Sequence, residues 1–348
     1  MTSPVRLESC RRILVVRLSS LGDVVRATGC VQALRAACPG AEIVVATGQP
    51  FAAVFRHDPA VDRLLLAPPS LPPVPFLRDA LRQLSPLWRD GGFDLALDLQ
   101  GTKPSAVWTY ASRARVMAGR GGHRPGWAFS VRPDLSVADV AEATSILRRL
   151  GVGTEHALPR LVRSREADEA VSARLRAAGL PAKGFLAVCP FSRWPAKAWS
   201  TDRYAAVLGR LGTRGVGPAV VTGSDEEAAR ARELVAGLPP GTAVSIAGEL
   251  SLDELFALLA RARLVLTGDS GPMHAAAAVG TRVVALFGPT WPERAGPEGN
   301  GHVVLQRQRL PAYHAYRLSA SISAMEALGV EEVLAAVLRA WEVTGDAA

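Results

Sequence analysis

Residues Leu264–Pro289 read LVLTGDSGPMHAAAAVGTRVVALFGP, and this stretch decides the class of fold. The apolar run Leu264–Thr267 is predicted to be a buried strand, Pro272–Val279 a helix, and Arg282–Phe287 a second strand. Proline suits the first turn of a helix, because the N–H that it lacks would have no partner there. A strand, a helix and a strand in direct succession indicate one β-α-β unit of a parallel sheet.

The same alternation of apolar runs and amphipathic segments extends along most of the chain. In the first half, strands are expected at Ile13–Val16, Glu42–Ala46, Arg63–Leu66 and Phe93–Leu99, and helices at Val24–Ala37, Pro104–Val116 and Asp139–Leu150. In the second half, further strands are expected at Phe185–Cys189 and Ala219–Thr222, and helices at Thr201–Leu211, Asp225–Val235, Leu252–Ala260 and Val330–Trp341. The proline-rich stretch Pro68–Pro75 is expected to be a surface connection.

These elements and the length of 348 residues predict two domains. Both are expected to be Rossmann-like α/β domains, each a doubly wound parallel sheet with helices on both faces, with a ligand-binding cleft between the domains. Residues 1–165 are assigned to the first domain and 166–328 to the second. The helix within residues 329–348 could pack on either domain, including back on the first.

Charge and cysteine content restrict the partners and the compartment. The net charge of +8 favours acidic partners such as nucleotide phosphates, phosphorylated glycans or anionic lipids. No basic run, paired Cys/His spacing or aromatic RNP-like strand indicates a nucleic-acid partner. The four cysteines have no metal-ligand spacing, and the apolar run Ile13–Val16 is too short for a signal peptide or a membrane span. We therefore expect a cytoplasmic protein with reduced thiols, which could associate peripherally with the inner face of the inner membrane.

The first informative turn is Arg17–Asp23, RLSSLGD, because ligands bind parallel sheets at the carboxyl ends of the strands. The spacing Ser20-x-x-Asp23 is typical of a capping box, in which Asp23 would only close the first turn of a helix. Gly22 is unfavourable in a helical turn, unless a ligand must approach the backbone closely. Asp23 is therefore a candidate general base beside the cleft, with Ser19, Ser20 and Gly22 lining the loop.

The second turn, Pro190–Trp199, reads PFSRWPAKAW and carries two cations and two indoles. Arg193 and Lys197 could hold a diphosphate. Trp194 and Trp199 could cover a bound ligand or anchor the loop. The alternative is a surface loop that the two tryptophans fix in place.

The third turn, Thr267–His274, reads TGDSGPMH and is the most specific of the three. The backbone N–H groups of Ser270 and Gly271, at the start of a helix, would form a phosphate-binding site. Asp269 could accept hydrogen bonds from sugar hydroxyls. The alternatives are that Asp269 or Ser270 only caps the helix, and that His274 is a packed histidine.

A further turn follows the strand that ends at Phe287, and its residues Gly288 and Thr290 are expected to line the same cleft. A carboxylate, a basic loop and a helix N-terminus are together the parts that an inverting sugar transfer by direct displacement requires. No Asp-x-Asp pair occurs in the chain, so no metal site is expected. The protein's own cations and helix dipole would stabilise the departing diphosphate.

Two stretches are similar to the signatures of glycosyltransferase family 9, the ADP-heptose:lipopolysaccharide heptosyltransferases: Val15–Ala27, VVRLSSLGDVVRA, and Thr267–Pro289, TGDSGPMHAAAAVGTRVVALFGP. The resemblance spans nearly the whole chain. It implies a GT-B fold without a cofactor, with an acceptor-binding first domain and a nucleotide-sugar-binding second domain. The implied reaction is a metal-independent, inverting transfer from ADP-L-glycero-D-manno-heptose to the inner core of lipopolysaccharide.

The resemblance also implies roles by position. The family's catalytic aspartate falls on Asp23, and its ribose-binding glutamate falls on Glu227, or on Glu226 if the alignment shifts by one residue. Its phosphate and sugar contacts fall on Lys197, Asp269 and Gly271. No motif fixes the acceptor contacts, for which the basic candidates in the first domain are Arg56, Arg115 and Arg120.

One departure from the family concerns four cysteines that many relatives carry after the last strands. The matching positions here are Ala312, Ala315, Ala320 and Ala324, directly before Met325. We hypothesise natural loss or a Cys→Ala replacement, with coincidence in an alanine-rich chain as the alternative. The chain offers no thiol ligands at these positions.

Two other functions fit parts of the sequence. A transferase of the same fold could use another nucleotide sugar or a different acceptor, because a base and a diphosphate site serve any such donor. A two-domain ligand-binding protein of the periplasmic type would have a similar outline, but the expected lack of a signal peptide argues against it.

Overall fold

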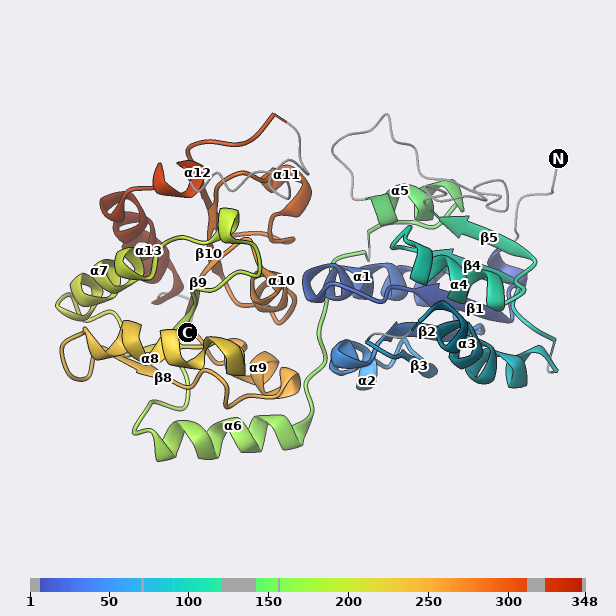
Figure 1. Ribbon diagram of the computed structural model, residues 1–348, viewed down its shortest axis with the longest axis horizontal. Coiled ribbons are helices and arrows are strands. Elements are labelled where there is room, and N and C mark those ends of the chain that lie inside the picture. The colour runs from blue at the N-terminus through green and yellow to red at the C-terminus, as the bar shows by residue number, and fades with distance from the viewer. Residues whose placement is uncertain are drawn as a thin grey trace. The chain divides into compact units, whose positions relative to one another are not determined.

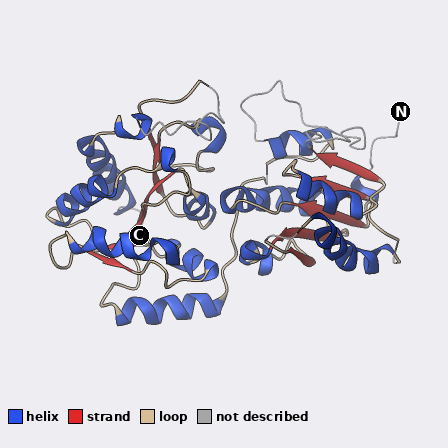
Figure 2. Cartoon of the chain, in the orientation of Figure 1, coloured by secondary structure: helices blue, strands red, loops and turns tan. Residues whose placement is uncertain are grey.

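The computed structural model describes residues 7–69, 72–89, 91–119, 142–155, 157–311 and 323–345. The chain divides into two compact units, unit 1 from Met1 to Val162 and unit 2 from Arg163 to Ala348 (Figure 1). Each unit contains one parallel sheet covered by helices (Figure 2). The division falls three residues before the second domain was expected to start.

The described residues of unit 1 form five parallel strands in the order β3-β2-β1-β4-β5. The strands are β1 (Arg12–Val16), β2 (Glu42–Gly48), β3 (Arg63–Ala67), β4 (Leu95–Asp98) and β5 (Val116–Gly119). The helices are α1 (Leu21–Ala37), α2 (Ala53–Arg56), α3 (Pro73–Trp88), α4 (Lys103–Ala111) and α5 (Glu142–Arg149), with short 3-10 turns η1 (Leu7–Ser9) and η2 (Gln49–Phe51). The chain first adds β2 and β3 on one side of β1 and then adds β4 and β5 on the other side. The switch point therefore lies between β1 and β4, where Val16 pairs with Asp98. Ligands of open parallel sheets bind at such a switch point.

In the part of unit 2 that the structure describes, six parallel strands lie in the order β11-β10-β9-β6-β7-β8. The strands are β6 (Leu186–Cys189), β7 (Ala219–Val221), β8 (Ala243–Ser245), β9 (Leu264–Gly268), β10 (Val283–Phe287) and β11 (Val303–Gln306). The helices are α6 (Arg165–Ala177), α7 (Thr201–Gly212), α8 (Ala228–Ala236), α9 (Leu252–Leu259), α10 (Gly271–Ala278), α11 (Pro292–Ala295), α12 (Ser323–Glu326) and α13 (Val330–Gly345), with 3-10 turns η4 (Pro195–Lys197) and η5 (Asp225–Glu227). The switch point lies between β6 and β9, where Cys189 pairs with Thr267.

Helix α13 packs in the core of unit 2. Its apolar side chains Val333 and Val337 are fully buried in the core that Leu208 and Leu211 of α7 also enter. A salt bridge joins Arg210 of α7 to Glu331 at the start of α13. Burial of apolar surface is the main force that holds a helix on a domain. The apolar side chains of α13 are buried in the same core as residues of the second sheet. The C-terminal helix therefore completes the core of unit 2.

Two predicted segments differ from the structure. The helix expected over Pro104–Val116 ends at Ala111, because Arg113 has a φ of 54° and the strand β5 begins at Val116. The connection expected over Pro68–Pro75 overlaps the start of α3 at Pro73. Proline suits this first helical position, as it does at Pro272 in α10, because the N–H that it lacks would have no partner there.

Burial keeps the described cysteine thiols unreactive. Cys10, Cys30, Cys38 and Cys189 are all buried. Burial raises the pKa of the Cys10 thiol and of the Cys189 thiol to about 11. The thiolate is the reactive form of cysteine, so both groups stay protonated at neutral pH.

A loop near the end of unit 1 crosses helix α1 at Gly29. The backbone N–H of Arg160 donates to the hydroxyl of Thr28 at 2.9 Å, and a Cβ on Gly29 would lie 1.9 Å from the carbonyl oxygen of Ala157. We expect Gly29→Ala to lower the free energy of unfolding by about 1–3 kcal/mol, because the loop must move away.

Gly209, in helix α7, provides the matched control for Gly29→Ala. A Cβ there would meet only Leu238 at an ordinary 3.8 Å. Gly209→Ala is expected to stabilise the protein by up to about 1 kcal/mol, because alanine is the better helix former. Denaturant unfolding of both variants checks the prediction, and equal stability of the two would contradict it.

His302 makes the stability of unit 2 depend on pH. Its Nδ1 accepts the N–H of Val283 at 3.2 Å, and its Nε2 lies 3.2 Å from the carbonyl of Glu298. Burial lowers the pKa of His302 below its usual value of 6.5, and the nearby charge of Arg282 lowers it further. The folded protein thus favours the neutral ring, and the unfolded chain binds the proton more readily.

The expected result is a loss of stability as the pH falls from the unfolded-state pKa near 6.5 through the lower folded-state value. The contribution is fully present above pH 6.5. Denaturant unfolding between pH 8 and pH 5 (roughly the range over which histidine titrates) should therefore show a shallower pH dependence for His302→Asn than for the wild type. Identical slopes would show that His302 does not contribute.

Candidate active site

Asp23 lies in the first turn of α1, next to the switch point of unit 1. Its side chain is 44% exposed, and its Oδ2 lies 2.7 Å from a guanidinium nitrogen of Arg17. The hydroxyl of Ser20 donates to the same oxygen at 3.2 Å. Ser20 occupies the N-cap position of α1, but its side chain accepts no capping hydrogen bond. The carboxylate of Asp23 is thus held by Arg17 and Ser20 and stays open to solvent.

The other loop residues expected beside Asp23 differ in exposure. Ser19 and Ser20 are exposed, whereas Gly22 is buried in the first turn of α1. Two further residues at this turn, Arg17 and Gln100, were not predicted from the sequence; Gln100 follows β4. The carboxamide oxygen of Gln100 accepts the N–H of Leu18 at 2.7 Å and that of Ser19 at 3.1 Å. The adjacency of β1 and β4, which the sequence does not reveal, brings this side chain to the turn.

Lys197 and Asp269 form a buried ion pair at the switch point of unit 2. Lys197 Nζ lies 2.7 Å from Asp269 Oδ2, and the two residues are 8% and 7% exposed. The hydroxyl of Thr290 donates to the same oxygen at 2.6 Å. The two residues meet because Lys197 follows β6 and Asp269 follows β9, and these strands are neighbours. The expected phosphate contact and the expected sugar contact therefore lie side by side.

The loop that carries Lys197 is fixed to the C-terminal part of unit 2. The indole N–H of Trp199 donates to the carbonyl of Leu328 at 3.1 Å, and its ring packs edge-on against Tyr204 with centroids 5.0 Å apart. Trp199 is buried, so it anchors the loop and is not available to cover a ligand. Arg193 is exposed, and Trp194 is partly buried. Of the two cations expected here, Lys197 is held rigidly and Arg193 faces solvent.

Helix α10 begins where the third turn predicted it. Ser270 is at the N-cap position, but its side chain makes no capping hydrogen bond; its hydroxyl lies 3.2 Å from that of Thr267. Gly271 is the first residue of the helix, and His274 within it is buried. The start of a helix has N–H groups without intrahelical partners and a partial positive charge, which together favour an anion. The buried Lys197 follows the neighbouring strand.

Gly288 and Thr290 are buried residues in the turn after β10. A Cβ on Gly288 would lie 2.5 Å from the sulfur of Met325, so the glycine allows α12 to pack closely. The carboxamide of Gln306 donates to the carbonyls of Gly288 and Thr290 at 2.8 and 2.6 Å. The turn is thereby fixed with the hydroxyl of Thr290 on Asp269.

Glu227, the expected ribose contact, closes the turn after β7. Its carboxylate accepts the N–H of Ser224 at 2.8 Å, and it is partly exposed. The neighbouring Glu226, the alternative assignment, is exposed. A Cβ on Gly223 would lie 2.9 Å from the ring of Phe191 and 3.1 Å from Glu227, which explains the glycine.

The basic candidates for acceptor contacts lie at different edges of unit 1. Arg56 ends α2, which follows the carboxyl end of β2, and it is exposed. Arg115 directly precedes β5 and pairs with Asp94 at 3.5 Å, so it lies at the amino ends of the strands, opposite Asp23. This position separates Arg115 from the candidate site. Arg120 lies outside the described residues.

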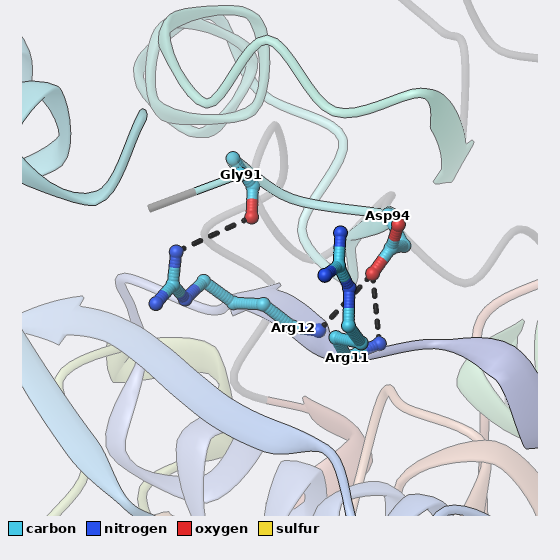
Figure 3. A pocket seen from close by; sticks show the side chains of 5 residues that line it. Arg11, Arg12, Gly91 and Asp94 are labelled. Carbon is cyan, nitrogen blue, oxygen red and sulfur yellow. Dashed lines mark hydrogen bonds between the residues drawn. The ribbon is translucent and has the colours of Figure 1, made fainter. Parts of the chain in front are cut away.

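A small hollow lies at the amino ends of β1 and β4 and is lined by Arg11, Arg12, Gly91, Gly92 and Asp94 (Figure 3). The carboxylate of Asp94 accepts hydrogen bonds from the backbone N–H groups of Arg11 and Arg12 at 2.8 and 3.2 Å. The hollow is therefore at the edge of the sheet opposite the Asp23 turn, where parallel sheets do not bind their ligands.

Among the described residues, no group of three or more His, Cys, Asp or Glu side chains is arranged to hold a metal ion. Ala324, one of the four positions where the resemblance led us to expect cysteines, is buried. The other three, Ala312, Ala315 and Ala320, lie outside the described residues.

The chain folds as two Rossmann-like units, as glycosyltransferases of the GT-B class do. Residues 82–320 match the profile of glycosyltransferase family 9 (heptosyltransferase). The chain belongs to this family, and it is an enzyme that transfers a sugar.

Relatives of known name agree with this assignment. The chain is 27% identical to lipopolysaccharide heptosyltransferase 1 of Pseudomonas aeruginosa over 309 residues, which cover 84% of this chain and 83% of the relative. It is 25% identical to lipopolysaccharide heptosyltransferase 3 of Escherichia coli over 276 residues, which cover 77% and 81%. Both matches extend over most of each protein.

Solved structures share the fold. A glycosyltransferase family 9 protein from Veillonella parvula superposes with a TM-score of 0.85 at 22% identity, over 95% of this chain and 97% of that chain. The ADP-heptose lipopolysaccharide heptosyltransferase II of Escherichia coli gives a TM-score of 0.76 at 20% identity, over 95% and 98%. These likenesses confirm the predicted GT-B fold.

Proposed function

We propose that the chain transfers L-glycero-D-manno-heptose from its ADP donor to a hydroxyl of the lipopolysaccharide inner core, with inversion at the anomeric carbon and without a metal ion. The names of the relatives support the donor and the acceptor, since two of them are lipopolysaccharide heptosyltransferases. An Escherichia coli heptosyltransferase of the same fold has been solved with ADP and with ADP-2-deoxy-2-fluoro heptose.

The observation that carries the proposal is the open carboxylate of Asp23. In the proposed step, the acceptor oxygen forms a bond to the anomeric carbon while its proton passes to Asp23, and the bond from that carbon to the diphosphate breaks. The electron pair of the broken bond leaves with ADP. The guanidinium of Arg17, 2.7 Å from Asp23, holds the carboxylate in place beside the turn.

Unit 2 would bind the donor. Lys197 and the N–H groups of Ser270 and Gly271 are proposed to stabilise the negative charge that develops on the diphosphate, with Arg193 as an additional cation. When the diphosphate engages Lys197, the carboxylate of Asp269 becomes available to the sugar hydroxyls. Glu227 is proposed to accept hydrogen bonds from the ribose, and His274 to support the helix that binds the phosphates.

Attachment of the enzyme to a membrane would bring it to a lipid-linked acceptor. None of the described helices is both long and apolar enough to cross a membrane. We propose peripheral association with the anionic inner face of the inner membrane, supported by the net charge of +8. Binding to anionic vesicles should then decrease at high salt, and flotation at low and high salt measures it; equal binding to neutral vesicles would contradict the proposal.

A donor panel tests the proposed function. Release of the nucleotide diphosphate is measured with ADP-heptose, ADP-glucose and UDP-glucose, each with and without a core acceptor that lacks heptose. We expect acceptor-dependent release from ADP-heptose alone, unchanged by EDTA. Release from a different donor would assign the chain to another specificity within the same fold, and binding of ADP-heptose without acceptor-dependent release would contradict the proposed reaction.

A further inference from the structure

We infer that Gln100 is the positioning residue that fixes the turn of Asp23, so that it controls the rate of transfer without contacting a substrate. The inference rests on the proposed function, in which Asp23 is the base. Three sets of contacts in unit 1 carry it.

The first set concerns the backbone that leads from β1 to Asp23. On the side of β2, pairing continues past the end of β1, because Gly48 donates its N–H to the carbonyl of Leu18 at 3.1 Å. On the side of β4, backbone pairing stops at Leu99, whose N–H donates to the carbonyl of Val16 at 3.0 Å. The N–H groups of Leu18 and Ser19 point beyond that end, and the carboxamide oxygen of Gln100 accepts both, at 2.7 and 3.1 Å. The side chain thus extends the sheet by one step.

The second set fixes Gln100 itself. Its backbone N–H donates to the carboxylate of Asp98 at 2.9 Å, and its carboxamide nitrogen donates to the hydroxyl of Thr102 at 2.9 Å. Asp98 is 1% exposed and also accepts the N–H of Gly101 and the hydroxyl of Ser105, at 2.9 and 3.0 Å. A side chain held at both ends in this way presents its oxygen in one orientation.

The third set links the same loop to the carboxylate. The carbonyl of Leu99, next to Gln100, accepts a hydrogen bond from the guanidinium of Arg17. The other end of that guanidinium pairs with Asp23 at 2.7 Å. The loop after β4 therefore holds Asp23 twice, through the backbone of Leu18 and Ser19 and through the side chain of Arg17. A displacement of about 1 Å in a reacting group can cost a factor of about 100 in rate, so this support bears directly on catalysis.

Gln83 provides a matched control in the same unit. Its carboxamide also clamps a backbone from both sides, because it accepts the N–H of Leu66 at 3.1 Å and donates to the carbonyl of Leu66 at 3.0 Å. Like Gln100 it is partly buried. It supports β3 and has no contact with the turn of Asp23 in these hydrogen bonds. Loss of this clamp should affect stability alone.

The experiment compares Gln100→Met and Gln83→Met by steady-state transfer and by denaturant unfolding. We expect both variants to lose stability, but only Gln100→Met to show a kcat lower by about 10- to 100-fold, with an unchanged KM for ADP-heptose. A folded Gln100→Met enzyme with a kcat within about twofold of the wild type, or an equal loss in Gln83→Met, would overturn the inference.

A shorter side chain covers the case in which Gln100→Met does not fold. Gln100→Asn keeps the carboxamide and removes one methylene, so its oxygen cannot reach both N–H groups, and the same selective loss of kcat is expected. Asp23→Asn is measured in parallel to separate the two claims. Full activity of Asp23→Asn would contradict the proposed base, whereas an inactive Asp23→Asn beside a fully active, folded Gln100 variant would contradict only the role of Gln100.

Discussion

Lys197→Met is expected to destabilise unit 2 by about 3–5 kcal/mol and to lower kcat by about 100- to 1000-fold. The stability effect follows from burial, since Asp269 is 7% exposed and would lose the cation 2.7 Å away. Thr290 would remain as a partner of the carboxylate, and a single hydroxyl does not neutralise a buried charge. The kinetic effect follows from the loss of the rigid cation beside the departing diphosphate.

A double variant separates these two consequences of Lys197→Met. Adding Asp269→Asn removes the uncompensated charge, so most of the lost stability should return, because the two positions are in direct contact and their effects are not additive. Activity should not return, because the cation is still missing. Denaturant unfolding and steady-state transfer measure the two effects. A single variant as stable as the double variant would show that the ion pair is not a buried, coupled unit.

Asp23→Asn is expected to lower kcat by about 100- to 10,000-fold, the usual range for loss of a general base. Asparagine has nearly the same shape as aspartate and still offers an oxygen to Arg17 and Ser20, so the turn should keep its structure. Donor binding is expected to be unchanged, because the proposed donor contacts all lie in unit 2. Titration with ADP-heptose and steady-state transfer measure the two quantities.

Asp62→Asn is the matched control for the loss of Asp23. Asp62 is also an arginine-paired aspartate of unit 1, with a side chain 45% exposed against 44% for Asp23, and its partner is Arg35. It accepts the N–H of Ile43, which lies in β2. The same chemical change there should leave kcat within about twofold. An Asp23→Asn enzyme that keeps more than about a tenth of the wild-type kcat would remove Asp23 from the role of base.

The turns of the site could be predicted because a parallel sheet has strong sequence signals. Strands such as Ile13–Val16 and Val283–Phe287 are completely buried, so each is a continuous apolar run followed by small and polar residues. The start of α10 could be placed from Pro272, which fits only the first turn of a helix. Asp23 and Asp269 were therefore located by pattern. Their turns suggested a base and a sugar contact, and the family resemblance implied the same roles.

The contacts between these turns could not be predicted, because local sequence patterns do not indicate which strands are neighbours in a sheet. The pairing of Lys197 with Asp269 depends on the adjacency of β6 and β9, and the clamp of Gln100 on Ser19 depends on that of β1 and β4. Both pairs are far apart in the sequence. A glutamine after a strand is an ordinary loop residue until its neighbours are known.

Short elements at the edges of the sheets also gave little signal. Strand β8 has three residues and β11 is partly exposed, so neither forms the long apolar run by which the central strands were found. Arg113 adopts a left-handed conformation that no residue type other than glycine signals reliably, and this hid the end of α4. The proline-rich stretch Pro68–Pro75 was interpreted as a surface connection, although Pro73 starts α3.

The anomeric configuration of the transferred heptose is the most direct test of Asp23 as the base of a single displacement. A single displacement, with Asp23 taking the proton and ADP leaving from the opposite side, inverts the anomeric carbon. The product formed by the wild-type enzyme from ADP-heptose and a heptose-free core acceptor is isolated, and its configuration is determined by NMR. We expect a configuration opposite to that of the donor. Retention would require two displacements and a second nucleophile, and would contradict the role assigned to Asp23.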